Sequence, residues 1–166
     1  MKTILNRRSI RKYKDLKVSD EVIEELLKAG MAAPSAGNEQ PWEFIVLRDK
    51  DIMKKITEVH PYSKMLLNAD VAIVVCGDES KEVFKGFWVQ DCSVATENIL
   101  LEAEDKGLGA VWVGVYPIKD RIDGIKKILD LPNSVIPLSI IPVGYKDEEK
   151  KAEDRFKKER IHHDRW

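Results

Sequence analysis

Six consecutive apolar residues, Val71 to Cys76, form a run that is short for a helix and lacks the alternating polar residues of a strand facing water. This pattern is typical of a strand that is buried on both faces. Such a strand requires covering layers on both sides of its sheet. We therefore expect residues 71–76 to lie at the centre of a sheet that is covered by helices.

Helix signals surround this run. Ser19 is a suitable N-cap for a helix whose first turn contains Asp20 and Glu21, where the helix dipole favours negative charge. Gly30 and Pro34 are expected to end this helix. Further helices are predicted over residues 52–59, about 84–106 and 122–129, with Gly107 as a C-cap of the second.

Strand signals occur over residues 42–47, 111–115 and 135–143. The last segment contains Pro137 and Pro142, which lack a backbone N–H and would suit an edge strand or a bulge. Several connections look too short for regular right-handed crossovers between parallel strands. The predicted fold class is α+β, with a central mixed β-sheet wrapped by helices, in a single domain over residues 1–166.

Charge and cysteine content argue against several function classes. Lys and Arg number 28 against 29 Asp and Glu, so the net charge of -1 supplies no field to gather nucleic acid or anionic lipid. We find no secretory signal and no apolar run of membrane-spanning length. Cys76 and Cys92 form no CxxC pair, which favours reduced core thiols in a cytoplasmic protein. His60, His162 and His163 lack metal-ligand spacing, so no metal site is predicted.

Residues 7–11 place three guanidinium groups and a hydroxyl within five positions. Guanidinium forks suit a phosphate ester and a polarised carbonyl beside it. Arg7, Arg8, Ser9 and Arg11 are therefore candidate residues of an anion site. The alternative is a solvated basic N-terminus, because short basic clusters are common on surfaces.

Two other segments could face a heterocycle. Asn38 and Gln40 can donate and accept hydrogen bonds at once, although Asn in a turn also forms local hydrogen bonds. Trp112, Val113 and Gly114 could present backbone groups to a flat ring, or could simply be a core strand. A Rossmann site is rejected, because the Gly-Leu-Gly sequence at 107–109 follows a helix instead of preceding one.

Ordered motifs along the whole chain resemble the short, single-domain form of the FMN-dependent nitroreductase family. They are the Arg-Arg-Ser-Ile-Arg start, the Pro-Ser-Ala-Gly-Asn-Glu-Gln-Pro-Trp sequence at 34–42, and residues 69–75, 91–101 and 107–114. The resemblance implies a nitroreductase-like fold in an intertwined homodimer. It also implies FMN at the dimer interface, bound by residues of both chains.

The same resemblance implies contacts at the phosphate end of FMN. Arg7 is expected to bind the phosphate, Arg8 the phosphate or ribityl chain, and Arg11 the N1 and O2 edge of the flavin, with Ser9 a further ligand. The segment from about 146 to 166 is expected to extend over the partner subunit. Within it, Arg155 is expected to close over the phosphate, whereas Glu153 replaces a basic residue often found in larger members.

Contacts to the flavin ring are implied for two other segments. The loop with Pro34, Ser35, Asn38 and Gln40 is expected to lie against the flavin from the second subunit. The backbone of Trp112, Val113 and Gly114 is expected to approach the ring, with Gly114 closest to N5. No catalytic side chain is predicted, because the flavin carries the chemistry.

The activity implied by the resemblance is FMN-dependent NAD(P)H oxidoreduction. Two electrons would pass by a ping-pong mechanism from NADH or NADPH to a nitroaromatic, a quinone or a similar small acceptor. Alternatives on the same fold are a flavin reductase, a dehalogenase, an oxidase or a flavin-binding protein without turnover. A nucleic-acid module using the same arginines would lack a wider basic face.

Overall fold

The structure is a computed structural model, in which residues 2–166 are described. Five α-helices occur in this part of the chain: α1 (Lys2–Asn6), α2 (Asp20–Met31), α3 (Lys50–Val59), α4 (Trp88–Asp105) and α5 (Lys119–Ile128). The strands are β1 (Trp42–Leu47), β2 (Val71–Asp78), β3 (Leu108–Ala110), β4 (Val113–Gly114) and β5 (Val135–Tyr145). Short 3-10 helices are η1 (Ala36–Asn38), η2 (Lys64–Leu67), η3 (Glu79–Lys81) and η4 (Lys158–Arg160).

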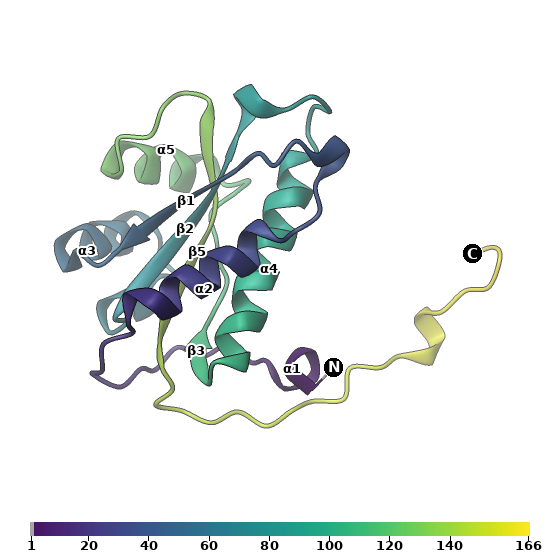
Figure 1. Ribbon diagram of the computed structural model, residues 1–166, viewed down its shortest axis with the longest axis horizontal. Coiled ribbons are helices and arrows are strands. Elements are labelled where there is room, and N and C mark those ends of the chain that lie inside the picture. Colours follow the sequence, from purple (N-terminus) through teal and green to yellow (C-terminus); the bar gives the residue numbers. More distant parts are fainter. Residues whose placement is uncertain (1) are drawn as a thin grey trace.

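One sheet, covered on both faces, forms the body of the molecule (Figure 1). Its strand order is β1-β2-β5-β3, and β4 also pairs with β5. Alternate residues of β2 pack into two different hydrophobic clusters, one with α2 and α4 and the other with α3 and α5. All of residues 71–76 are fully buried, which confirms the strand predicted to be covered on both faces.

The named strands pair antiparallel throughout, so the expectation of a mixed sheet is wrong for them. Parallel pairing is limited to an isolated bridge between Ser9 and Ala110. A connection long enough to contain a helix permits a parallel crossover but does not impose one. Here α3 and η2 pack against each other between β1 and β2, and the chain returns to the end of the sheet that it left.

Strand β5 lies inside the sheet, between β2 and the short strands β3 and β4. Of the two positions considered for its prolines, the edge is therefore wrong. The pairing of β2 with β5 shifts register between Val75 and Cys76, and Pro137 is the partner of Cys76. An irregularity of this kind accommodates a residue that cannot donate to the ladder.

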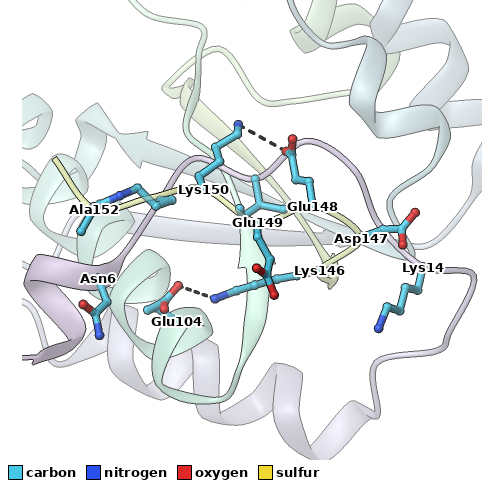
Figure 2. Close-up of a pocket in the computed structure, with 11 residues that line it drawn as sticks. Asn6, Lys14, Glu104, Lys146, Asp147, Glu148, Glu149, Lys150 and Ala152 are labelled. Carbon is cyan, nitrogen blue, oxygen red and sulfur yellow. Dashed lines mark hydrogen bonds and ion pairs between the residues drawn. The ribbon is translucent and has the colours of Figure 1, made fainter.

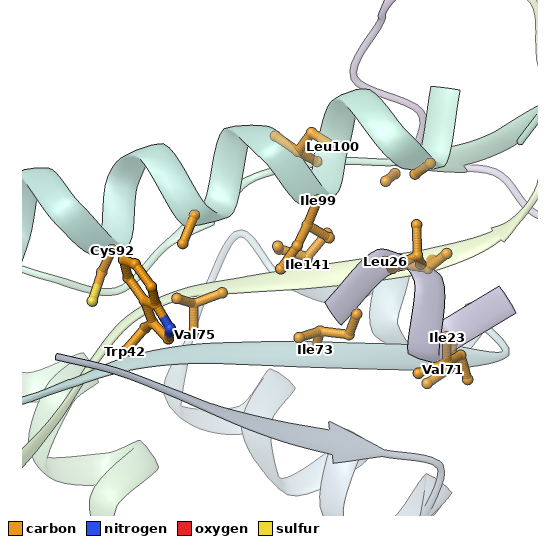
Figure 3. Close-up of a cluster of buried hydrophobic side chains, with 14 of the residues drawn as sticks. Ile23, Leu26, Trp42, Val71, Ile73, Val75, Cys92, Ile99, Leu100 and Ile141 are labelled. Carbon is orange, nitrogen blue, oxygen red and sulfur yellow. The ribbon is translucent and has the colours of Figure 1, made fainter. Parts of the chain in front are cut away.

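Helix α4 is the central packing element, and it is shorter than predicted. It begins at Trp88 instead of near residue 84, after Gly86 with a φ of 90° interrupts the helical conformation. Gly107, with a φ of 74°, follows its end in the left-handed conformation expected of a C-terminal cap. Figure 3 shows Ile99 of this helix and Leu26 of α2 above the sheet residues Ile73 and Ile141.

Helix α2 follows its prediction closely. The Ser19 side chain accepts a hydrogen bond from the backbone N–H of Val22 at 3.3 Å, so it caps the helix as expected. The helix runs one residue past Gly30, which is buried against α4, where a Cβ would lie 3.0 Å from Ile99. The absence of a side chain thus lets α2 and α4 approach closely.

Of the strand predicted over residues 111–115, only Val113–Gly114 is a strand, β4, while β3 precedes the predicted range and residues 111 and 112 lie between the two strands. The C-terminal residues 151–166 are exposed and leave the body of the molecule as an extended segment (Figure 1). They carry the exposed apolar side chains Phe156, Ile161 and Trp166. Across residues 2–166, the helices lack the combination of length and apolar character needed to cross a membrane.

Candidate functional site

The predicted basic residues gather in one pocket, which we call the arginine pocket. It has a volume of about 470 Å³ and is lined by Arg7, Arg8, Ser9, Arg11, Lys150, Lys151, Glu153 and Arg155. The N-terminal segment and the start of the tail thus meet, although they are far apart in sequence. Six of these eight residues are basic and one is acidic, so the pocket is suited to an anion.

The arginines of this pocket differ in the ion pairs and hydrogen bonds that their guanidinium groups already form within the chain. Arg7 forms an ion pair with Glu97 of α4, with Nε and Oε1 3.0 Å apart. The exposed Arg155 pairs with Glu153, with Nη2 and Oε2 3.6 Å apart. An exposed pair of this kind contributes little stability, so Arg155 remains available for another anion.

Arg8 has a guanidinium nitrogen that is both buried and unsatisfied. Its Nε donates to the carbonyl of Lys151 at 2.9 Å and its Nη1 to the carbonyl of Arg7 at 2.6 Å. Its Nη2 is buried and has no hydrogen-bond partner within the described chain. A buried donor without an acceptor costs about 1–3 kcal/mol, or more when it is charged. An approaching anion would remove this cost.

A larger cavity of about 710 Å³ adjoins the arginine pocket (Figure 2). Arg8 and Lys150 line both cavities. The lining of the larger one has mixed charge, and Lys146 is already paired with Glu104 at 2.6 Å. We therefore regard the arginine pocket as the better candidate for an anion.

The loop from Pro34 to Gln40 holds its two amide side chains against each other. Gln40 donates from Nε2 to Oδ1 of Asn38 at 2.9 Å, and its backbone N–H donates to Oγ of Ser35 at 3.0 Å. Asn38 and Gln40 have φ values of 57° and 47°. Non-glycine residues in this region are strained and often mark functional sites. The local hydrogen bonds considered for these residues are thus present.

Two carboxyl groups, of Asp91 and Glu39, connect this loop to neighbouring segments. Oδ1 of Asp91 accepts from the backbone N–H of Ala36 at 3.1 Å, and Oε2 of Glu39 accepts from Val83 and Phe84 at 2.7 and 3.1 Å. The remaining oxygens, Oδ2 of Asp91 and Oε1 of Glu39, are buried without a donor in the described chain. Burial raises the pKa of Asp91, and the negative charge of nearby Glu39 raises it further.

This arrangement predicts a pH-dependent stability that Asp91→Asn removes. Because the folded pKa of Asp91 is raised, the native state holds its proton more tightly than the unfolded state. Its stabilising contribution is complete below the unfolded pKa of about 3.9 and is lost as the pH rises through the raised folded pKa. An Asn at this position can still accept from Ala36 and can donate to Glu39. We expect the variant to be about 1 kcal/mol more stable at pH 8, or roughly 2–4 °C in Tm.

Thermal unfolding between pH 4 and pH 8 is the measurement for this variant. The stabilisation should shrink toward pH 4, as the wild-type carboxyl takes up its proton. Asp15→Asn, a substitution at an exposed carboxylate, is the matched control. Equal Tm differences at both ends of the pH range would contradict the account.

Gly114 differs from the other eight glycines in what occupies the space beside it. A Cβ added there would meet only Nε1 of Trp112, at 3.9 Å. The other glycines either have a positive φ or lie where a Cβ would come within 3.0 Å of a neighbouring atom. Neither backbone conformation nor packing within this chain therefore requires glycine at position 114. The absent side chain leaves open space beside β4.

The predicted site residues are brought together only in part. Ser9 bridges to Ala110, so the arginine segment lies beside the end of β3, which precedes Trp112, Val113 and Gly114 in the chain. The loop from Pro34 to Gln40 does not line the arginine pocket. It contacts α4 at Asp91, whereas the N-terminal segment contacts α4 at Glu97 and Asp105. These two positions are about 9 and 21 Å further along the helix axis.

Several residues of the region were missed by the sequence analysis. Lys150 and Lys151 line the arginine pocket, but they occur in a tail so rich in charge that nothing marked them. His60 was considered only as a metal ligand, and it is 1% exposed with both ring nitrogens hydrogen-bonded. Burial raises the pKa of Cys76 to about 12, so this core thiol is not a nucleophile at neutral pH.

Comparison with known families and sequences gives consistent results. The model described as "Nitroreductase family" matches residues 4–60 and 57–145. A protein of Methanothermobacter thermautotrophicus, provisionally named NADH dehydrogenase/NAD(P)H nitroreductase, is 52% identical over 166 residues. This alignment covers 100% of the chain and 87% of the relative.

Solved structures agree in fold. A structure from Parabacteroides distasonis with the same provisional name has a TM-score of 0.96 at 47% identity and covers 99% of this chain and 97% of its own. A provisionally named nitroreductase from Desulfovibrio desulfuricans, solved in complex with FMN, has a TM-score of 0.86 at 29% identity. That alignment covers 99% of this chain and 96% of the other.

Proposed function

We propose, on the basis that the chain belongs to the nitroreductase family, that it is an FMN-dependent NAD(P)H oxidoreductase. The observation that carries the proposal is the meeting of Arg7, Arg8, Arg11 and Arg155 in one pocket. This pocket lies beside the strand region that leads to Gly114, because Ser9 bridges to Ala110. A phosphate site next to open space for a flat ring is what binding of FMN requires.

The arginine pocket would hold the FMN phosphate. Arg8 offers a buried guanidinium nitrogen that lacks an acceptor, and the phosphate supplies oxygen acceptors. Arg7 and Arg155 add positive charge, with Arg7 oriented by its ion pair to Glu97. Arg11, at the exposed rim, is assigned to the N1 and O2 edge of the flavin.

The ring would lie against the strand region that contains Trp112, Val113 and Gly114. Supporting this placement, Gly114 leaves space that packing within the chain does not need. FMN supplies the redox chemistry by accepting two electrons from NADH or NADPH and passing them to an acceptor. The residues around it bind and orient the ring, and a cation near N1 and O2 favours added negative charge there.

A homodimer would complete the site. In one chain the loop from Pro34 to Gln40 and the arginine segment contact separate parts of α4, so we assign the loop to the flavin site of the partner. A groove of about 350 Å³ lies among α1, α2 and α4, and Ile4, Leu5 and Met31 are exposed on α1 and α2. Apolar patches of this kind mark protein interfaces.

The tail would pack on the same partner. Residues 151–166 are exposed along their length and carry Phe156, Ile161 and Trp166 outside the body of the molecule. Large apolar side chains held in water are unfavourable, and docking on a second copy would bury them. Sedimentation should give a mass about twice the 19.0 kDa of one chain. A monomeric mass at micromolar protein concentration would contradict the proposed homodimer.

The acceptor is proposed to be a nitroaromatic, a quinone or a similar small molecule, reduced in a ping-pong mechanism. The purified protein should take up FMN and show flavin absorbance that bleaches with NADH or NADPH under anaerobic conditions. Addition of a nitroaromatic or a quinone should restore the absorbance. Failure to bind FMN would overturn the proposal, and bound FMN that neither nucleotide bleaches would leave a binding protein without turnover.

A further inference from the structure

The Gly114 carbonyl is held by two side chains that come from different elements. Nε2 of His60 lies 2.8 Å from this oxygen, and Nη1 of Arg121 donates to it at 3.1 Å. His60 follows the last residue of α3, and Arg121 lies in the first turn of α5. The two residues are 54 and 7 positions from Gly114 in sequence, so the convergence is a product of the tertiary fold.

The hydrogen bonds around His60 fix its tautomer. A carbonyl oxygen only accepts, so Nε2 carries the hydrogen in its contact with Gly114. Nδ1 receives the backbone N–H of Tyr62 at 3.3 Å, so it is the unprotonated nitrogen. The backbone carbonyl of His60 also accepts from Oγ of Ser63 at 2.7 Å. The orientation of the ring is therefore set by hydrogen bonds at both of its nitrogens, with Nε2 as the donor to Gly114.

Arg121 is oriented by a second contact. Its guanidinium carbon lies 5.4 Å from the centre of the Tyr62 ring, within the range of a cation–π interaction. Tyr62 also makes an edge contact with the His60 ring at 6.4 Å between centroids. The three side chains thus form one cluster, and two of them donate to the same carbonyl.

The backbone beyond Gly114 is restrained as well. The N–H groups of Val115 and Tyr116 donate to the carbonyl of Leu138 at 2.9 and 3.1 Å. Because Gly114 has no side chain to restrict its dihedral angles, external contacts must determine its conformation. The two donors to its carbonyl and the bonds after it together fix this short part of β4.

We infer that His60 and Arg121 are positioning residues that hold the Gly114 backbone at the distance a bound flavin ring needs. The inference rests on the proposed function, in which the ring lies against β4. Misplacement of a reacting group by about 1 Å can lower a rate by about hundredfold. Loss of either donor should therefore affect electron transfer more than phosphate-dependent binding of FMN, since the arginine pocket is formed by other residues.

The test uses two variants. Arg121→Met removes the guanidinium donor to the Gly114 carbonyl and keeps the apolar part of the side chain. His60→Leu removes the buried imidazole donor to the same carbonyl. His60→Gln retains an N–H donor and should restore much of the loss caused by His60→Leu. Lys119→Met is the matched control, because this exposed lysine lies on the same helix and is paired with Asp123. Arg121 is only half-buried, so its variant keeps the test valid if His60→Leu fails to fold.

The first readout requires no flavin. Hydrogen exchange of the Val115 and Tyr116 amides should become about tenfold faster in Arg121→Met than in the control, corresponding to the loss of one hydrogen bond to a charged group. In the FMN-loaded protein, the rate constant for flavin reduction by NAD(P)H should fall about tenfold or more, while the FMN dissociation constant stays near that of wild type.

The outcomes separate this inference from the function on which it rests. A wild-type protein that does not bind FMN, or is not reduced by NAD(P)H, removes the proposed function whatever the variants do. If wild type is reduced but Arg121→Met exchanges and reacts like the control, the positioning role is wrong. Parallel losses of Tm, FMN affinity and rate would also overturn it, because they would indicate a general packing role.

Discussion

Gly114→Val is expected to fold as stably as wild type and to lose about hundredfold in the rate of flavin reduction. The valine meets open space within the chain, since the nearest atom to an added Cβ is 3.9 Å away. Valine is also favourable in a strand. Its two methyl groups would instead occupy the space assigned to the flavin ring. Stopped-flow reduction by NAD(P)H and thermal unfolding of the same samples provide the measurement.

Two further glycine variants control for the effect of an added side chain. Gly114→Ala adds a single methyl group, so it should produce a smaller loss of the same kind. Gly77→Val should instead lower the Tm, because a Cβ there would lie 2.3 Å from the Trp88 ring and would destabilise the core. A Gly114→Val protein that is reduced at the wild-type rate would remove this strand from the flavin site.

Arg8→Met is expected to weaken FMN binding by about tenfold to a hundredfold. A hydrogen bond to a charged group contributes about 1.5–3 kcal/mol, and about 1.4 kcal/mol corresponds to a factor of ten in affinity. Arg8 is the arginine whose Nη2 is buried without a partner in the described chain, and Met keeps most of its apolar stem. Titration of the flavin-free variant with FMN, followed by fluorescence, measures the change.

The expected ranking of the arginine variants makes this prediction specific. Arg160→Met replaces an exposed arginine of the tail outside the arginine pocket and should leave FMN affinity unchanged. Arg7→Met should combine weaker binding with lost stability, because Arg7 also pairs with Glu97 of α4. Equal FMN affinity of Arg8→Met and wild type would exclude Arg8 as a phosphate ligand.

The sequence predicted correctly those structural features that depend on residues close to one another in the chain. The cap at Ser19, the left-handed residue Gly107 and the buried run of β2 each depend on neighbouring positions, and all three are confirmed. The position of β5 inside the sheet was not predictable in this way. Its prolines suggested an edge or a bulge, and the pairing with β2 shows a register shift next to Pro137, where Leu138 has no partner.

The site, too, could be predicted only where its residues are close together in sequence. The cluster at residues 7–11 is visible as a pattern, and its residues do lie in one pocket with Arg155. The pairing of Arg7 with Glu97 and the convergence of His60 and Arg121 on Gly114 join residues far apart in sequence. Single buried or paired residues of this kind leave no periodic signal, so tertiary structure is needed to identify them.

The exposed tail has a consequence for the order of assembly. The sheet and its covering helices form hydrophobic clusters that contain none of residues 151–166, so the domain can reach its folded state before the tail docks. Folding is then a unimolecular step, whereas the proposed docking of the tail on a second copy would depend on protein concentration. Newly made chains at low concentration would carry a formed core and an unprotected tail, and the tail would be the first segment open to proteolysis.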